Sequence, residues 1–393
     1  MSPTITATQR RARLGRRHHL AVRASGAAPE VLVEDLLVLH ATDPASVYLS
    51  LAARSLDLTD AAIGRALYDD RTLIRMLGMR RTMFVVPTGV AAVVQHSSSV
   101  AVASRLRRAL VKELGAVVPG DADAWLADVE ASVVDRLRAT GGATAVALAA
   151  AEPRLRTQLV MAAGKTYGGA VAITSRALTI LAAQGAIVRG RPGGGWTASR
   201  YEWAPIEKWL PAGFPALNPN QARAALVDRY LAAFGPATVA DLVWWTGWNQ
   251  GDTRRAVSEI DTVTVDLGGE SGLVLADDTA PVDEPAPWIA LLPALDPTPM
   301  GWFGRDWYLE PAYRAALFDR TGNIGPSIWC DGRVVGGWAH GAGGTVRWRL
   351  FTDIGAEQAA AVAAEAARLT DWMAGVRVLP KFRTPLEKEL AAG

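Results

Sequence analysis

The chain has 393 residues, of which half are hydrophobic, and a formal net charge of only +2. This length exceeds one ordinary hydrophobic core, so a small single domain is excluded and several modules are expected. No uninterrupted apolar run reaches the roughly 18 residues that cross a bilayer, and the basic first residues lack the apolar core of a secretory signal. We therefore expect a cytoplasmic protein without a membrane partner.

Cysteine and histidine usage argues against metal chemistry. Cys330 is the single cysteine, which excludes intramolecular disulfides and a thiolate-rich zinc site. No HExxH or HxH spacing links the histidines into a ligand set. We expect neither a metal nor a cofactor. The five histidines are His18, His19, His40, His96 and His340.

The first residues are unusually rich in arginine. Because guanidinium groups bind phosphates through a planar fork of donors, this cluster suits a polyanion, and residues 1–28 are predicted to form a basic N-terminal arm. Alternatively, the arginines lie on a solvated helical face and are frequent only because a high-GC genome prefers arginine codons. The arginines are Arg10, Arg11, Arg13, Arg16, Arg17 and Arg23, with no acid among them.

Three segments then follow one plan: a helix, a second helix opened by Thr or Asp, an arginine-rich third helix and a short β-hairpin. This is the order of a winged helix. The first unit, residues 29–115, is the most diverged. In it LTDAAIGRALYDDRTLIRMLGM is predicted as helices, and RRTMFVVP as a strand that Pro87 closes.

The second unit, residues 116–207, shows the plan most clearly. In AITSRALTILAAQG, Thr174 or Ser175 can cap a helix that ends at Gly185. AIVRG and WTASRYEW then alternate as strands, and RPGGG between them supplies the hairpin turn. The hairpin residues predicted to contact DNA are Arg189, Arg191 and Arg200.

The third unit, residues 208–280, starts a helix at Thr238, turns at TGWNQGD and forms a third helix from Thr253 to Ile260. That helix bears Arg254 and Arg255, further candidates for DNA contact, and VTVDLGGESGLVLADD follows as the hairpin. Trp244, Trp245 and Trp248 resemble a stacking platform, although tryptophans at this spacing more often belong to a core.

Residues 281–393 are predicted to form a β-rich domain. After a linker rich in proline and tryptophan, IGPSIWCDGRVVGGWAH and GTVRWRLF indicate a β-meander with turns at Asp331-Gly332 and Gly341 to Gly344. An amphipathic helix is expected from Ala356 to Met373, and VRVLPKFRTPLEKEL as a strand and a tail. The predicted fold class is therefore α+β, with three tandem winged-helix domains before a C-terminal β-rich domain.

The stretch VLHATDPASVYLSLAAR gathers polar groups inside apolar sequence. Pro44 disfavours helical geometry in the residue before it, so a helix from Glu30 to Ala41 is expected to stop near Thr42. Asp43 can cap the next helix, with Pro44 at its first position. His40 would then lie in the last turn of the first helix, where the dipole favours a cation. The alternative is purely structural: Asp43 caps a helix, Thr42 bonds a free backbone carbonyl, and His40 fills the corner between the two helices.

Over nearly its whole length the sequence resembles the AlkZ-like (YcaQ-type) winged-helix DNA glycosylases. The matching segments are LLVLHATDPASVYLSLAAR, ALYDDRTLIRMLGMRRTMFVVP, and LLPALDPTPMGWFGRDWYL with DGRVVGGW. The resemblance implies tandem winged helices and a β-rich domain around a concave DNA channel. In the best-known members two glutamines flanking an apolar residue hold the attacking water. Aligned by the following Asp-Pro, those positions are His40 and Thr42, so both glutamines are absent here.

The resemblance implies a glycosylase of base-excision repair that hydrolyses the N-glycosidic bond of alkylated purines. We expect it to be monofunctional, because no lysine or N-terminal amine stands near the proposed corner to form a Schiff base. Histidine, with an unperturbed pKa of about 6.5, could accept the proton of the water, which contributes roughly 10²–10⁴-fold. Asp43 could place negative charge near C1′, while Thr42 fixes the water or the rotamer of Asp43. His40, Thr42 and Asp43 are thus the candidate catalytic residues.

Double-stranded DNA is the expected partner of a monomer associated with the nucleoid. A helix fits the major groove, and basic hairpins reach phosphates or the minor groove. Arg80 and Arg81, just before the strand Thr82 to Val86, could grip phosphates, or else cap a helix or pair with Asp69 or Asp70. Two other functions stay open: a winged-helix DNA-binding protein without chemistry, and a protein-interaction module.

Overall fold

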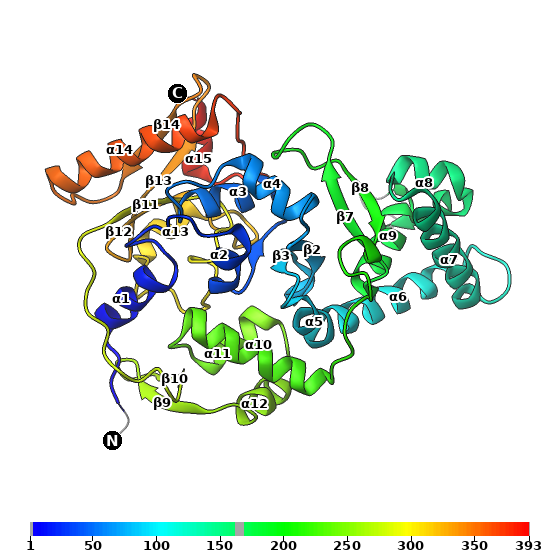
Figure 1. Cartoon of the computed structure of the whole chain (residues 1–393), viewed down its shortest axis with the longest axis horizontal. Helices are drawn as coiled ribbons and strands as arrows, with labels where there is room; N and C mark the ends of the chain where they lie inside the picture. Colours follow the sequence, from blue (N-terminus) through cyan, green and yellow to red (C-terminus); the bar gives the residue numbers. More distant parts are fainter. Residues whose placement is uncertain (1–2, 162–168, 393) are drawn as a thin grey trace.

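The computed structural model describes residues 3–161 and 169–392. Helices and antiparallel sheets alternate along the chain (Figure 1). The largest hydrophobic cluster joins residues from the first hundred positions to residues after position 287. Within these ranges no helix is long and apolar enough to span a membrane.

The arginine-rich start forms helix α1 (Ala7–Arg17), which packs on the protein and does not extend as a free arm. Arg13 is 2% exposed, and it pairs with Asp278 at 2.5 Å. Arg17 bonds the same carboxylate, and the guanidinium of Arg10 lies 4.1 Å from the ring centre of Trp307. The expected basic arm is therefore corrected: much of its charge is neutralised or covered inside the protein.

Residues 29 to 87 form a small sheet flanked by helices, in the strand order β1-β3-β2. The predicted helix over residues 30–41 ends at Asp35, because the apolar run of residues 36–39 is wholly buried and leads into a strand instead. Residues 73–77, also expected in a helix, form β2. The elements are α2 (Pro29–Asp35), β1 (Leu39–His40), α3 (Pro44–Ala52), α4 (Asp60–Tyr68), β2 (Leu73–Leu77), η1 (Met79–Arg81) and β3 (Met83–Pro87).

In the segment from residue 91 to 208, α5 lies near the centre of Figure 1, and α6 to α9 with β7 and β8 form the part drawn at the right. Gly185 ends α9 with φ 84°, as predicted, but the N-cap is Ile173, and the Thr174 hydroxyl donates to the carbonyl of Leu155 at 2.8 Å. The elements are α5 (Ala91–Val94), η2 (Gln95–Ser99), α6 (Val100–Leu114), α7 (Ala122–Thr140), β4 (Ala143–Thr144), α8 (Ala145–Ala151), η3 (Pro153–Arg156), β5 (Gln158–Met161), β6 (Gly169–Ala172), α9 (Thr174–Gln184), β7 (Ile187–Pro192), β8 (Tyr201–Pro205) and η4 (Ile206–Lys208).

The hairpin of β7 and β8 is confirmed, although its second strand begins later than expected. Trp196, predicted at the start of that strand, lies before it and packs on Tyr48 and Trp372, with ring centres 5.3 and 5.7 Å away. Burial of this large ring against residues distant in sequence outweighs the local alternation of the strand pattern.

Residues 219 to 275 contain three helices and a hairpin. The helix start at Thr238 is confirmed as a capping box with Asp241, while the third helix begins at Gln250, three residues before the predicted Thr253. Asn249 explains this earlier start, because its side chain accepts from the amide of Asp252. The elements are α10 (Pro219–Phe234), α11 (Val239–Thr246), α12 (Gln250–Ser258), β9 (Thr262–Asp266) and β10 (Ser271–Leu275).

The C-terminal part confirms the β-meander, as a four-stranded antiparallel sheet in the order β11-β12-β13-β14. Helix α14 has the predicted bounds. The expected final strand is wrong: residues 376–380 form neither helix nor strand, and α15 follows them. The elements are β11 (Ile289–Leu292), η5 (Pro311–Tyr313), α13 (Arg314–Leu317), β12 (Ser327–Cys330), β13 (Arg333–His340), β14 (Val346–Leu350), α14 (Ala356–Met373) and α15 (Pro385–Ala392).

Candidate functional site

His40 ends strand β1 and faces a small cavity. It pairs with Phe84 across the sheet, with ring centres 5.8 Å apart. The cavity holds about 70 Å³, which is room for a few water molecules. Its other walls come from segments far apart in the sequence: Val38, Met79, Arg80, Thr82, Phe234, Trp244, Trp245, Pro297, Met300 and Asn323.

The imidazole of His40 is neutral at pH 7. Burial, reinforced by the positive charge of Arg80, lowers its pKa to about 4. The helix-end cation expected from the sequence is wrong, because no helix ends at His40. Its Nδ1 accepts from the backbone N–H of Thr42 at 3.4 Å, which leaves Nε2 to carry the ring proton.

Asp43 lies close in sequence but faces a different cavity, lined by Trp338 and His340. One carboxylate oxygen accepts from the amide of Ala45 at 3.2 Å, which confirms the predicted cap of α3, and the other accepts from the amide of Lys381 at 2.8 Å. Its burial raises its pKa. The structure therefore separates the carboxylate from the imidazole with which the sequence grouped it.

Thr42 is half-buried at the corner between the two. The preceding residue, Ala41, donates its amide to the carbonyl of Met83 at 2.8 Å and accepts from the guanidinium of Arg75 at 2.9 Å. Arg75 is buried in strand β2. It holds the corner in place, and no local sequence pattern pointed to it.

Arg80 and Arg81 are exposed and lie in a tight connection, with φ of 53° and 59°. The guanidinium of Arg80 lies 4.5 Å from a ring centre of Trp244, and that of Arg305 lies 4.9 Å from the same ring. Burial, together with the nearby charge of Arg305, lowers the pKa of Arg80. Asp69, an expected alternative partner of these arginines, pairs with Arg191 instead.

The remaining candidate arginines differ in accessibility. Arg189 is half-buried beside Tyr201 and Trp203, and burial lowers its pKa to about 10. Arg191 is engaged by Asp69 at 2.7 Å through both carboxylate oxygens. The side chains of Arg200, beside the hairpin, and of Arg254 and Arg255, on α12, are exposed.

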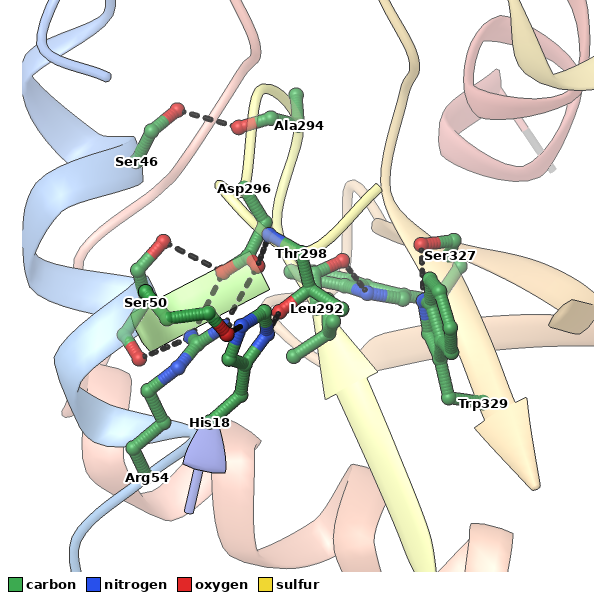
Figure 2. Close-up of polar contacts among 12 residues, drawn as sticks. His18, Ser46, Ser50, Arg54, Leu292, Ala294, Asp296, Thr298, Ser327 and Trp329 are labelled. Atoms are coloured by element: carbon green, nitrogen blue, oxygen red, sulfur yellow. Dashed lines mark hydrogen bonds and ion pairs between the residues drawn. The ribbon is translucent and has the colours of Figure 1, made fainter. Parts of the chain in front are cut away.

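A buried ion pair between Arg54 and Asp296 lies at the centre of a polar network (Figure 2). Arg54 donates to the two carboxylate oxygens of Asp296 at 2.8 and 2.7 Å, and both side chains are fully buried. The hydroxyl of Ser50 also donates to Asp296, at 2.7 Å, and Arg54 also donates to the hydroxyl of Thr298. That hydroxyl in turn contacts Nδ1 of His18 at 2.8 Å.

These bonds join α1, α3 and the loop of residues 293–300. Pro297 and Met300 of this loop line the cavity of His40. The amide of Thr298 donates to Asp296 at 2.9 Å, so the carboxylate fixes the loop backbone as well. We infer that the network holds this loop in place and so determines the shape of the cavity, although the side chains of the network do not line the cavity.

Acid is expected to destabilise the protein through His18 and His40. Burial lowers the pKa of His18 to about 3, and that of His40 to about 4, from about 6.5 in an unfolded chain. Between about pH 6.5 and pH 5 the unfolded chain therefore binds more protons, so the free energy of unfolding falls as pH falls. Each histidine contributes about 1.4 kcal/mol per pH unit. Denaturant titrations at several pH values measure this slope.

The matched variant is His18→Gln, which removes one titrating group. Its stability at pH 7 is expected to be lower, but its slope between about pH 6.5 and pH 5 should be about half that of the native chain. An unchanged slope in the variant would show that His18 does not titrate as its burial indicates.

This chain is similar to known proteins both in its fold and in its sequence. The fold is similar to that of Streptomyces sahachiroi DNA glycosylase AlkZ, with a TM-score of 0.74 and 21% sequence identity, over 96% of this chain and 99% of that one. The family model described as DNA glycosylase AlkZ-like matches residues 33–372. The chain belongs to the AlkZ-like DNA glycosylase family.

A curated relative is the interstrand DNA cross-link repair glycosylase of Streptomyces sahachiroi, which is 31% identical over 134 residues. That match spans 31% of this chain and only 35% of the relative. Within the described ranges, no group of three or more His, Cys, Asp or Glu side chains is placed to hold a metal ion.

Proposed function

We propose that this protein is a monofunctional DNA glycosylase that hydrolyses the N-glycosidic bond of alkylated purines in double-stranded DNA and acts as a monomer. The observation that carries this proposal is the neutral imidazole of His40, which faces a cavity large enough for water in a member of this family. No lysine lies among the residues that line this cavity, so hydrolysis by water is favoured over attack by an amine.

An N7- or N3-alkylated purine carries positive charge, so it can leave with the electrons of the C1′–N bond without being protonated. The protein must then stabilise the oxocarbenium-like sugar and place a water at C1′. A pKa of about 4 makes His40 a weak base. We therefore assign its Nε2–H to orienting the water, as a glutamine amide would, while the proton of the water passes to solvent.

Thr42 and Asp43 are given supporting roles. The Thr42 amide bonds Nδ1 and so sets the ring orientation that directs Nε2. Asp43 anchors the corner by bonding α3 and the segment at Lys381. Its two occupied oxygens and its separate cavity argue for a positioning role and against placing charge near C1′.

For DNA binding we propose three winged-helix units, residues 29–115, 116–207 and 208–280, which form a concave channel with residues 281–393. The exposed arginines Arg80, Arg81, Arg200, Arg254 and Arg255 would contact phosphates. Arg189 and Arg191, which are packed or paired, would do so only after giving up these contacts. The name of the curated relative extends the proposed substrates to interstrand cross-links.

The test is release of free base from two duplexes, one carrying N7-methylguanine and one carrying an interstrand guanine cross-link. We expect base release that leaves an abasic site, with strand cleavage only after alkali. Binding that weakens steeply with salt, but without base release from either duplex, would support the non-catalytic DNA-binding alternative. Absence of binding at low salt would favour a protein-interaction module.

A further inference from the structure

One aromatic side chain stands out from the surface near the proposed site. Phe303 is 60% exposed, whereas the other largely exposed hydrophobic residues of the described chain are valines and leucines. It lies in the sequence GWFGRDW, between β11 and η5. Exposing such a ring is unfavourable by about 25 cal/mol for each Å² of apolar surface.

The exposure of Phe303 does not come from a loose loop. The amides of Phe303 and Gly304 both donate to one oxygen of Asp241, at 2.8 and 3.1 Å, and Asp241 is 2% exposed. The neighbouring Trp302 is buried, and its indole N–H donates to the carbonyl of Phe234 at 3.1 Å. The backbone therefore holds the ring in solvent at a defined place.

That place is next to a wall of the His40 cavity. The ring centre of Phe303 lies 6.4 Å from that of Trp244, which lines the cavity. Arg80 and Arg305 both lie over the ring of Trp244. An exposed apolar ring thus stands beside positive charge, a combination suited to a base stack bounded by phosphates.

We propose that Phe303 is a wedge that enters the base stack of double-stranded DNA at the nucleotide whose glycosidic bond the site attacks. This inference rests on the proposed function. Apolar side chains inserted at a base step unstack it and kink the duplex, and aromatic rings stack favourably on the exposed bases. The rigid backbone means that little conformational entropy is lost on insertion.

The test uses a duplex with a tetrahydrofuran abasic analogue and 2-aminopurine beside it, on which no excision can occur. We expect the native chain to change the 2-aminopurine fluorescence several-fold and Phe303→Ala to leave it unchanged. Affinity for this duplex should fall about 10-fold in Phe303→Ala. Phe303→Trp should retain the fluorescence change. Leu56→Ala removes another exposed apolar side chain and should behave as the native chain does.

Equal fluorescence changes for the native chain and Phe303→Ala would overturn the wedge. The result is separate from catalysis: lack of base release from alkylated DNA would refute the proposed function, whereas equal fluorescence changes with normal base release would refute only the wedge. Because Phe303 is exposed, its alanine variant is expected to fold, and a thermal melt like that of the native chain would check this.

Discussion

His40→Ala is expected to lower the rate of base release about 100-fold, with affinity for the duplex nearly unchanged. The reason is that the imidazole lines the cavity and its Nδ1 is bonded to the Thr42 amide, so we assign Nε2–H to the attacking water, which loses its fixed position when the ring is removed. Single-turnover release of N7-methylguanine measures the rate, and anisotropy on the abasic-analogue duplex measures the affinity.

The conservative variant His40→Gln makes this prediction sharper. A glutamine amide also donates an N–H and restores the residue type that the best-known family members have at this position. We expect its rate to stay within about 10-fold of the native rate. A general base would behave differently, because glutamine cannot accept a proton at neutral pH and His40→Gln would then be as slow as His40→Ala.

The pH profile offers a second readout of the same role. With a pKa of about 4, His40 stays neutral from about pH 5 upward, so the single-turnover rate should be flat from about pH 6 to pH 8. A rate that rises with pH below about 6.5 and levels off above it would show an imidazole of ordinary pKa and would contradict the neutral orienting role.

Arg54→Met is expected to destabilise the protein by about 3–5 kcal/mol, the largest stability effect we predict. The substitution leaves the carboxylate of Asp296 fully buried without its cation, and removing one partner of a buried pair is costly. Denaturant unfolding monitored by tryptophan fluorescence measures the change. Because the network fixes the loop at Pro297, base release should fall in the same variant.

Arg349→Met is the matched control for this prediction. Arg349 bonds both oxygens of Glu389 at 2.9 and 2.7 Å, with the same two-pronged geometry as the buried pair, but its side chain is 45% exposed. Surface pairs of this type contribute little to stability, because water screens both charges. Equal losses of stability in the two variants would show that burial does not set the strength of the Arg54–Asp296 pair.

Local sequence signals predicted several elements well. The helix start at Thr238, the helix end at Gly185 and the helix Ala356 to Met373 depend on residues within a few positions of one another. Their physics is that of a single turn or one helix face, which a short stretch of sequence contains completely. The same holds for Asp43 as the cap of α3.

The strand at His40 was not predictable in this way. An apolar run such as Leu-Leu-Val-Leu can be a buried helix or a buried strand, and only pairing with residues 84 and 85 decided between them. That pairing turned the imidazole into one cavity and left Asp43 at another. The grouping of the two as one catalytic corner followed from their closeness in sequence, which does not set the direction of side chains.

By itself the sequence predicted the family, several helices and two hairpins, and the polar stretch at which the proposed site lies, because these depend on local patterns and on a resemblance that spans the chain. Tertiary structure alone brought Asp296 to Arg54, 242 positions apart, and Arg305 to Trp244. Contacts of this kind depend on how distant segments pack. The free-energy cost of a buried charge or of an exposed aromatic ring also depends on that packing, because the packing decides which groups water can reach.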